Sequence, residues 1–181
     1  MREKTKLSGV FIIAPTSHQD KRGWFMESYN KKEMAKYGID VSFVQDNHAL
    51  STKKGTLRGL HFQNNPMAQS KLVRCTRGAL LDVVVDIRKN SPTYKEWVAV
   101  TLSAKNKKQI FIPKGFAHGY ITLEPNTEIQ YKVDAYYSPE HDGTIYYGDP
   151  ELGIKWGSQA PILSDKDKNA PPLSESSANF I

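Results

Sequence analysis

Residues 81–88 read LDVVVDIR, a pattern of apolar and charged side chains that indicates how the chain folds. The apolar residues at the odd positions from Leu81 to Ile87 share one face of an extended strand, whereas Asp82 and Asp86 lie on the other face. Successive side chains of a strand point to opposite sides, so this pattern predicts a half-buried strand.

Similar runs recur along the chain. Residues 129–135 alternate in the same way, and shorter strands are expected at 10–13, 23–29, 58–63, 97–102, 109–112 and 119–123. Turn-forming residues separate these runs, for example Asn-Ser-Pro at 90–92 and Pro-Lys-Gly at 113–115. Many short strands with frequent turns are typical of a sandwich or a barrel. The sequence therefore predicts a mainly β fold.

Only short helices are expected beside the strands. Asn30 can cap one helix, with Glu33 three residues later and Gly38 at its end. A second short helix is expected to begin at Ser164, and the tail over about residues 170–181 is expected to be irregular. We find no linker or internal repeat, so residues 1–181 are expected to form a single domain.

Composition narrows the classes of partner. The chain has 181 residues, and its 25 Lys and Arg against 19 Asp and Glu give a net charge of +6, which favours anionic ligands. The basic residues form only scattered pairs, so we expect a small phosphorylated ligand and no nucleic acid. The one cysteine, Cys75, excludes a disulfide within the chain and is expected to be buried.

Several familiar signatures are missing. No segment approaches the roughly 20 apolar residues that span a membrane, and the first residues lack the apolar run of a signal peptide. We therefore expect a soluble, cytoplasmic protein that does not bind membranes. There is no Gly-x-Gly-x-x-Gly, no Walker loop and no paired-cysteine zinc pattern, which argues against nucleotide-dependent hydride chemistry and against structural zinc.

The first chemically rich cluster runs from Arg58 through His61 and Gln63 to Lys71. A histidine has a reference pKa of about 6.5, which suits a general base near neutral pH, and a lysine can supply positive charge to a developing oxyanion. The alternative is a half-exposed strand with an incidental histidine. Composition alone leaves both interpretations open.

The second cluster is IPKGFAHG at residues 112–119, which contains Pro-x-Gly-x-x-His. This pattern is similar to one found in cupin barrels, where such a histidine can bind a metal. Gln63 stands where a second histidine would be expected, and Lys71 stands where a carboxylate would serve. Because a protonated lysine is a poor metal ligand, we expect a cupin barrel without a metal.

The third cluster surrounds Tyr131, which lies on the inward face by alternation. A buried tyrosine usually packs and finds one hydrogen-bond partner, but it can also donate a proton. Tyr137 offers a flat face for stacking a nucleobase. Asp167 could orient a catalytic base, although its spacing from Ser164 is also that of a local helix cap.

Taken in order, these clusters resemble the dTDP-4-dehydrorhamnose 3,5-epimerase family. The matching motifs run from about residue 20 to residue 167, and they are Asp20-x-Arg22-Gly23-x-Phe25-x-Glu27, Gln45-x-Asn47, Gly55-Thr-Leu-Arg58-Gly-Leu-His61-Phe-Gln63, Pro66-x-x-Gln69-x-Lys71-Leu-Val73, Asp82-Val-x-Val-Asp86-x-Arg88, Ile112-Pro-x-Gly-Phe-Ala-His118-Gly, Tyr131-Lys-Val and Leu163-Ser-x-Lys-Asp167. No single motif is decisive, but the ordered set is specific.

The resemblance implies a fold and a reaction. The fold would be a cupin-like (jelly-roll) antiparallel β-barrel, in a homodimer that exchanges N-terminal strands. The reaction would be epimerisation at C3 and C5 of dTDP-4-dehydro-6-deoxy-D-glucose to dTDP-4-dehydro-L-rhamnose, in the biosynthesis of dTDP-L-rhamnose for cell-wall polysaccharide. Neither a cofactor nor a metal is implied.

The resemblance also implies roles for individual residues. His61 matches the base, Asp167 the carboxylate that orients it, and Tyr131 the acid that reprotonates from the opposite face. Lys71 and His118 would lie near the ketone oxygen or the sugar hydroxyls. The residues implied in binding the rest of the substrate are Arg22, Glu27, Gln45, Asn47, Arg58, Gln63 and Tyr137, with Tyr136 as a second candidate for the aromatic contact.

Three alternatives remain open from the sequence. A related enzyme could invert only one carbon or move the ketone. A non-catalytic nucleotide-sugar-binding cupin would keep the phosphate and base contacts without needing an acid and a base. A metal-dependent cupin oxygenase would need ligands that the first cluster does not supply.

Overall fold

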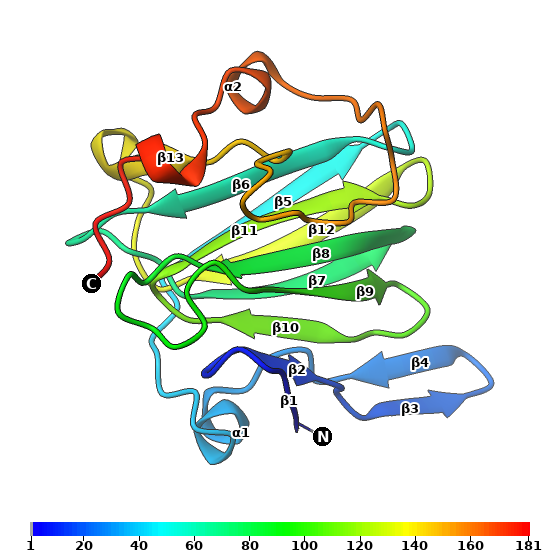
Figure 1. Ribbon diagram of the computed structural model, residues 1–181. Coiled ribbons are helices and arrows are strands. Elements are labelled where there is room, and N and C mark those ends of the chain that lie inside the picture. Colours follow the sequence, from blue (N-terminus) through cyan, green and yellow to red (C-terminus); the bar gives the residue numbers. More distant parts are fainter. Residues whose placement is uncertain (1) are drawn as a thin grey trace.

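The computed structural model describes residues 2–181, and it is built mainly from antiparallel strands (Figure 1). One sheet has six strands, in the order β1 (Arg2–Lys4), β2 (Phe11–Ile13), β10 (Gln109–Ile112), β7 (Lys71–Arg77), β12 (Thr127–Val133) and β5 (Gln45–Ser51). A second sheet has five strands, in the order β13 (Asp142–Thr144), β6 (Leu57–Gln63), β11 (Phe116–Thr122), β8 (Ala79–Asp86) and β9 (Trp97–Ser103). The predicted mainly β, antiparallel fold is confirmed.

The remaining elements are short. A separate hairpin pairs β3 (Ser17–Asp20) with β4 (Gly23–Met26). The helices are α1 (Lys31–Lys36) and α2 (Asp165–Lys168), with single 3-10 turns at Pro139–His141 and Leu173–Glu175. Among residues 2–181, none of the helices has the length and apolar character needed to span a bilayer.

The closed barrel that the sequence suggested is not confirmed. The six-stranded sheet ends at β5 and the five-stranded sheet ends at β13, which neighbours β6, and strand pairing within residues 2–181 does not join the two. The arrangement is instead two facing sheets (Figure 1).

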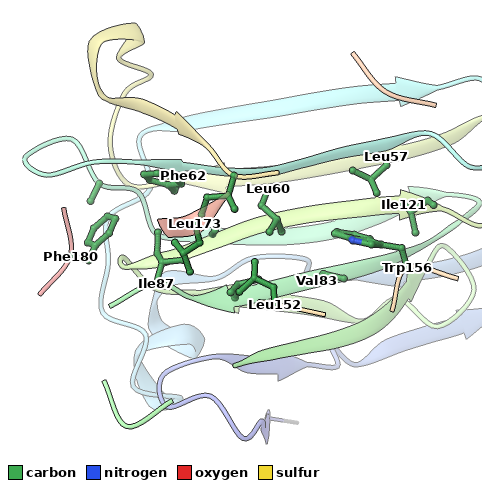
Figure 2. Close-up of a cluster of buried hydrophobic side chains, with 14 residues drawn as sticks. Leu57, Leu60, Phe62, Val83, Ile87, Ile121, Leu152, Trp156, Leu173 and Phe180 are labelled. Atoms are coloured by element: carbon green, nitrogen blue, oxygen red, sulfur yellow. The ribbon is translucent and has the colours of Figure 1, made fainter. Parts of the chain in front are cut away.

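Three apolar clusters hold these layers together. One lies between the sheets and includes Leu80, Val84 and Ile110. A second covers the outer face of the five-stranded sheet, where Trp156 and Phe180 from the C-terminal segment pack on its strands (Figure 2). A third lies under α1, on the outer face of the six-stranded sheet.

The interpretation of β8 as a half-buried strand is wrong. Asp82 and Asp86 are both 0% exposed, because β8 lies inside its sheet and is covered on both faces. The face formed by Val83, Val85 and Ile87 packs against the C-terminal segment rather than between the sheets. The face that carries Asp82 points between the sheets, where a charged group needs a partner.

Local signals set some boundaries correctly and others only to within a few residues. The Asn30 side chain accepts from the backbone N–H groups of Lys32 and Glu33, and Gly38 follows the helix at φ +78°. Glu33 pairs with Lys36 rather than closing a capping box. Strand β4 ends at Met26, three residues short of the prediction, and β11 begins at 116 rather than 119.

Buried Cys75 and the irregular tail also agree with the sequence. Cys75 lies in β7, and burial raises the pKa of its thiol to about 11, which makes it a packing residue. The tail beyond residue 169 has a single 3-10 turn as its regular structure, yet Leu173 and Phe180 are buried in the outer cluster.

Two glycines bring β6 and β11 unusually close together. A Cβ atom on Gly59 would lie 2.5 Å from the Cα of Gly119, and Gly59 has φ +127°. The strand register shifts between His118 and Tyr120 at this point, and His118 pairs directly with His61. The close pairing of β6 with β11 therefore brings His61 and His118 next to each other on neighbouring strands.

Candidate active site

A cavity of about 430 Å³ occupies the polar part of the space between the sheets. It lies beside the apolar core, with Tyr120 and Tyr131 at the boundary. Its lining residues come from both sheets and from the segment that leads into α2, and they are Ala49, Thr56, Leu57, Arg58, His61, Lys71, His118, Tyr120, Tyr131, Ile162, Leu163, Ser164 and Asp167.

His61, which is partly exposed, and Asp167, which is buried, form a pair at one side of this cavity. The Nε2 atom of His61 lies 2.6 Å from Oδ1 of Asp167, which is 2% exposed. Helix α2 lies next to β6 and so brings the carboxylate to the histidine (Figure 1). Because Nε2 is occupied, Nδ1 is the ring nitrogen left to take a proton.

Asp167 is held as a carboxylate by its neighbours. Burial alone would raise its pKa, but hydrogen bonds from His61 and Ser164 outweigh that effect and lower the pKa below the usual value. Ser164 Oγ donates to Oδ2 of Asp167 over 2.8 Å and accepts from the Asp167 backbone N–H. The helix cap and the contact with the histidine, which looked like alternatives in the sequence, therefore coexist.

A second histidine–carboxylate pair lies deeper. The Nε2 atom of His118 lies 2.8 Å from Oδ2 of Asp82, and both residues are buried. The other carboxylate oxygen of Asp82 is buried without a hydrogen-bond partner among the described residues. Asp82 is thus a buried carboxyl group that contacts His118 from behind the cavity wall.

Lys71 of β7 also lines the cavity, and Asp82 acts on it electrostatically. Its side chain is 8% exposed, and burial lowers its pKa to about 8, although Asp82 and Asp142 oppose the shift. An ammonium group with this pKa is still mostly charged at neutral pH. Lys71 therefore presents a cationic hydrogen-bond donor to the cavity, which His118 also lines.

Two tyrosines and one arginine complete the lining. Burial raises the pKa of Tyr131, and it raises that of Tyr120 to about 12, while the nearby Arg58 opposes both shifts. Arg58 donates to Ser51 Oγ and to the Leu50 carbonyl, each over 3.3 Å. Both phenols stay protonated at neutral pH and can donate protons.

The proposed acid and base come from different sheets. His61 lies on β6 of the five-stranded sheet, and Tyr131 lies on β12 of the six-stranded sheet. Both line the same cavity. A ligand bound there would meet one proton acceptor and one proton donor on opposite sides.

Other predicted residues form a second group near the end of β12. Gln45 accepts from the Tyr137 backbone N–H over 3.2 Å, and its amide nitrogen donates to Asn47. Tyr137 is 58% exposed, and its hydroxyl lies 3.4 Å from Asp142, which pairs with Lys166 of α2. Gln63 is 4% exposed and bonds to backbone groups of this segment rather than lining the cavity.

Within one chain the structure does not bring Arg22 and Glu27 to this cavity. The Arg22 side chain is 90% exposed and pairs with Asp20 beside it on the β3–β4 hairpin. Glu27 lines a different cavity of about 390 Å³, near α1.

Sequence reasoning missed two residues that the structure places at the site. Tyr120 follows His118 by two positions on one strand, and period-2 alternation alone could have found it. Asp82 belongs to one of the motifs, but the sequence predicts no role for it, because its contact with His118 depends on the pairing of β8 with β11. Among residues 2–181, no three His, Cys, Asp or Glu side chains are grouped so that they could hold a metal.

Comparison with known proteins places this geometry in a family. The family model for dTDP-4-dehydrorhamnose 3,5-epimerase matches residues 4–175. The chain is 52% identical over 174 residues to the Salmonella typhimurium dTDP-4-dehydrorhamnose 3,5-epimerase, covering 95% of this chain and 94% of that protein.

Solved structures agree with the sequence match. The Bacillus anthracis dTDP-4-dehydrorhamnose 3,5-epimerase, solved with TDP and PPi bound, is 49% identical with a TM-score of 0.94 and covers 95% of this chain and 98% of its own. The Legionella pneumophila dTDP-6-deoxy-D-glucose-3,5-epimerase, in complex with dTDP-4-keto-L-rhamnose, is 44% identical with a TM-score of 0.93 and covers 97% and 93%. The family that the sequence motifs suggested is thus confirmed, and this chain belongs to the dTDP-4-dehydrorhamnose 3,5-epimerase family.

Proposed function

We propose that this chain inverts C3 and C5 of dTDP-4-dehydro-6-deoxy-D-glucose, producing dTDP-4-dehydro-L-rhamnose for the synthesis of dTDP-L-rhamnose. The observation that carries the assignment is the placement of His61 and Tyr131 on opposite sheets across one cavity. Inversion of a carbon requires that a proton leave one face and return to the other. A pocket that only bound the sugar would not need this arrangement.

The C4 ketone makes the chemistry accessible. It acidifies the C–H bonds at C3 and C5, because the electron pair left by the proton delocalises onto the ketone oxygen as an enolate. His61 Nδ1 takes the proton, while Asp167 holds the ring and stabilises its positive charge. Tyr131 then gives its hydroxyl proton to the same carbon from the opposite face. Exchange with solvent returns His61 and Tyr131 to their starting states before the second inversion.

Charge on the ketone oxygen is stabilised by the groups behind the sugar. Lys71 and His118 line the cavity, and the Lys71 ammonium group would donate to the developing oxyanion. Arg58 would contact the diphosphate, since a guanidinium fork suits phosphate oxygens. Gln45, Asn47 and Tyr137 would hold the nucleotide, with Tyr137 stacking on thymine.

The number of inverted carbons is tested by isotope labelling. The protein is incubated with substrate in D₂O, and the label is located by NMR. We expect deuterium at both C3 and C5, and a coupled assay with a reductase and NADPH should yield dTDP-L-rhamnose. Deuterium at a single carbon would limit the enzyme to one inversion, and no deuterium at either carbon would leave a binding protein.

The charge on Lys71 predicts the alkaline limb of the rate profile. Lys71 is protonated below its pKa of about 8 and loses its charge above it, so kcat should fall as the pH rises through about 8. Tyr131 does not account for this limb, because burial raises its pKa and keeps it protonated there. Lys71→Arg, although slower, should keep kcat constant to about pH 10. An unchanged limb near pH 8 in that variant would assign it to another group.

We also infer a cupin-like jelly roll that forms a homodimer by exchanging its N-terminal strands. The β3–β4 hairpin pairs with neither sheet of its own chain, and its side chains Trp24 and Phe25 are 56% and 71% exposed. In Figure 1 the hairpin lies at the edge of the molecule, beyond the strands of the main sheets. A partner could use this hairpin to bring Arg22 and Glu27 to the substrate.

Mixing two inactive variants tests the exchange. Chains carrying Arg22→Ala and chains carrying His61→Ala should each be nearly inactive alone. If sites are shared, co-refolding at equal amounts should restore about a quarter of the wild-type activity. About half of the dimers would then be mixed, and each mixed dimer would have one of its two sites intact. No recovery in dimers shown to be mixed would mean that each chain supplies its own Arg22.

A further inference from the structure

The segment after β12 combines exposed aromatic rings with a tightly held backbone. Tyr136 and Tyr137 are 64% and 58% exposed. Side-chain amides nevertheless bind the backbone of residues 135–138 at four consecutive residues. These bonds run from Gln69 Nε2 to Ala135 O (2.9 Å), from Gln63 Nε2 to Tyr136 O (3.1 Å), from Tyr137 N to Gln45 Oε1 (3.2 Å) and from Ser138 N to Gln63 Oε1 (2.8 Å).

Gln63 contributes most to this arrangement. Its amide nitrogen also donates to the Met67 carbonyl over 2.6 Å, so both of its N–H groups are used within the protein. The side chain is 4% exposed and does not line the cavity. Gln63 therefore has no donor left for a ligand, in contrast to the substrate contact expected from the sequence.

Gln63 makes two hydrogen bonds to this segment, and they hold the peptide units before and after Tyr137. The Tyr136 carbonyl belongs to the peptide unit before Tyr137, and the Ser138 N–H belongs to the peptide unit after it. Fixing both peptide planes fixes φ and ψ of Tyr137, and with them the direction of its Cα–Cβ bond. Gln45 adds a third bond at the Tyr137 N–H.

We propose that Gln63 is a positioning residue that holds Tyr137 ready for the nucleobase without touching the substrate. The inference rests on the proposed function, which makes a dTDP-sugar the ligand. A ring whose backbone is already ordered loses less conformational freedom on binding, and this improves affinity. The same strand β6 then carries Arg58, His61 and Gln63, so one strand aligns the diphosphate contact, the base and the aromatic platform.

The test is a double-mutant cycle on dTDP affinity, measured by calorimetry. Tyr137→Ala should weaken dTDP binding about 10–100-fold, as expected for a lost stacking contact. Gln63→Met keeps the length of the side chain but none of its hydrogen bonds, and it should weaken dTDP about 5–10-fold and raise KM similarly, with kcat changed less than about threefold. The double variant should bind no more weakly than Tyr137→Ala, because Gln63 acts through Tyr137.

Matched variants separate positioning from general damage. Gln69→Met removes a bond to the same segment at Ala135, which does not flank Tyr137, and it should keep dTDP affinity within about twofold. If Gln63→Met does not fold, Gln63→Glu, which keeps the acceptor for Ser138, replaces it in the cycle.

Each outcome bears on a definite claim. Unchanged affinity in the Gln63 variant, or effects of Gln63 and Tyr137 that simply add, would overturn the positioning role while leaving the proposed function intact. Wild-type protein that fails to bind dTDP would overturn both.

Discussion

Replacing His61 with alanine is expected to abolish deuterium exchange at C3 and C5 while leaving dTDP binding nearly intact. The histidine lines the cavity between the sheets and is held by Asp167 at 2.6 Å, so in the proposed reaction it is the group that accepts the carbon-bound proton. Loss of a positioned general base costs about 10²–10⁴-fold in rate. We expect at least about a 10³-fold loss here, because exchange at both carbons begins with this step.

The measurement combines NMR of the sugar protons in D₂O with calorimetry of dTDP. Because Arg58 and Tyr137 are unchanged, the Kd for dTDP should stay within about threefold of wild type. Asp167→Asn should give an intermediate rate, since the base remains but its orienting carboxylate is lost. His48→Ala is a matched control, because His48 is an exposed histidine of β5 that pairs with Glu128 outside the cavity.

Two results would contradict the assignment of His61. Exchange that persists in the alanine variant at more than about a tenth of the wild-type rate would point to a different base. A loss of dTDP affinity as large as the loss of rate would mean that His61 serves binding rather than proton transfer.

How far the sequence predicted this molecule depends on the range of the interactions involved. Alternation and capping act over a few residues, and they correctly placed β6, β10 and the helix that follows Asn30. The surroundings of Asp82 depend on partners far along the chain: His118 lies 36 residues away, and the C-terminal segment covers the other face of β8. No local pattern distinguishes such a buried aspartate from a solvated one.

The site shows the same division. The resemblance to the family supplied His61, Lys71, Tyr131 and Asp167, and the structure brings these four residues to one cavity. The resemblance did not distinguish residues that line the cavity from residues that hold the lining in place. Gln63 illustrates the difference, because its bonds reach residues 136 and 138, more than 70 positions away in the chain. That geometry becomes visible only when the chain is folded.

Edge strands were the hardest elements to predict. No strand was expected at residues 45–51, which begin with polar side chains, yet they form β5, which pairs on one side with β12 and ends the six-stranded sheet. A strand with one unpaired edge and one face beside a polar cavity needs few apolar residues. The polar side chains by which β5 would hold a nucleotide therefore also remove its hydrophobic signal.

Replacing Tyr131 with phenylalanine is expected to separate proton removal from inversion. The change deletes only the hydroxyl and keeps the ring that packs against the core between the sheets. His61 can still form the enolate, so deuterium should continue to enter the sugar on the face that His61 serves. Inversion should fall by about 10²–10⁴-fold, because no protonated phenol remains on the opposite face.

The ratio of the exchange rate to the inversion rate tests whether Tyr131 acts only as the proton donor on the opposite face. Exchange is followed by NMR in D₂O, and inversion is followed by the reductase-coupled oxidation of NADPH. Tyr120→Phe is the matched control: Tyr120 lines the same cavity but lies on β11, in the sheet of the base, so removing its hydroxyl should leave the ratio unchanged. If Tyr131→Phe lost exchange and inversion equally, the phenol would be needed to form the enolate, and the donor on the far face would have to be sought elsewhere in the cavity wall.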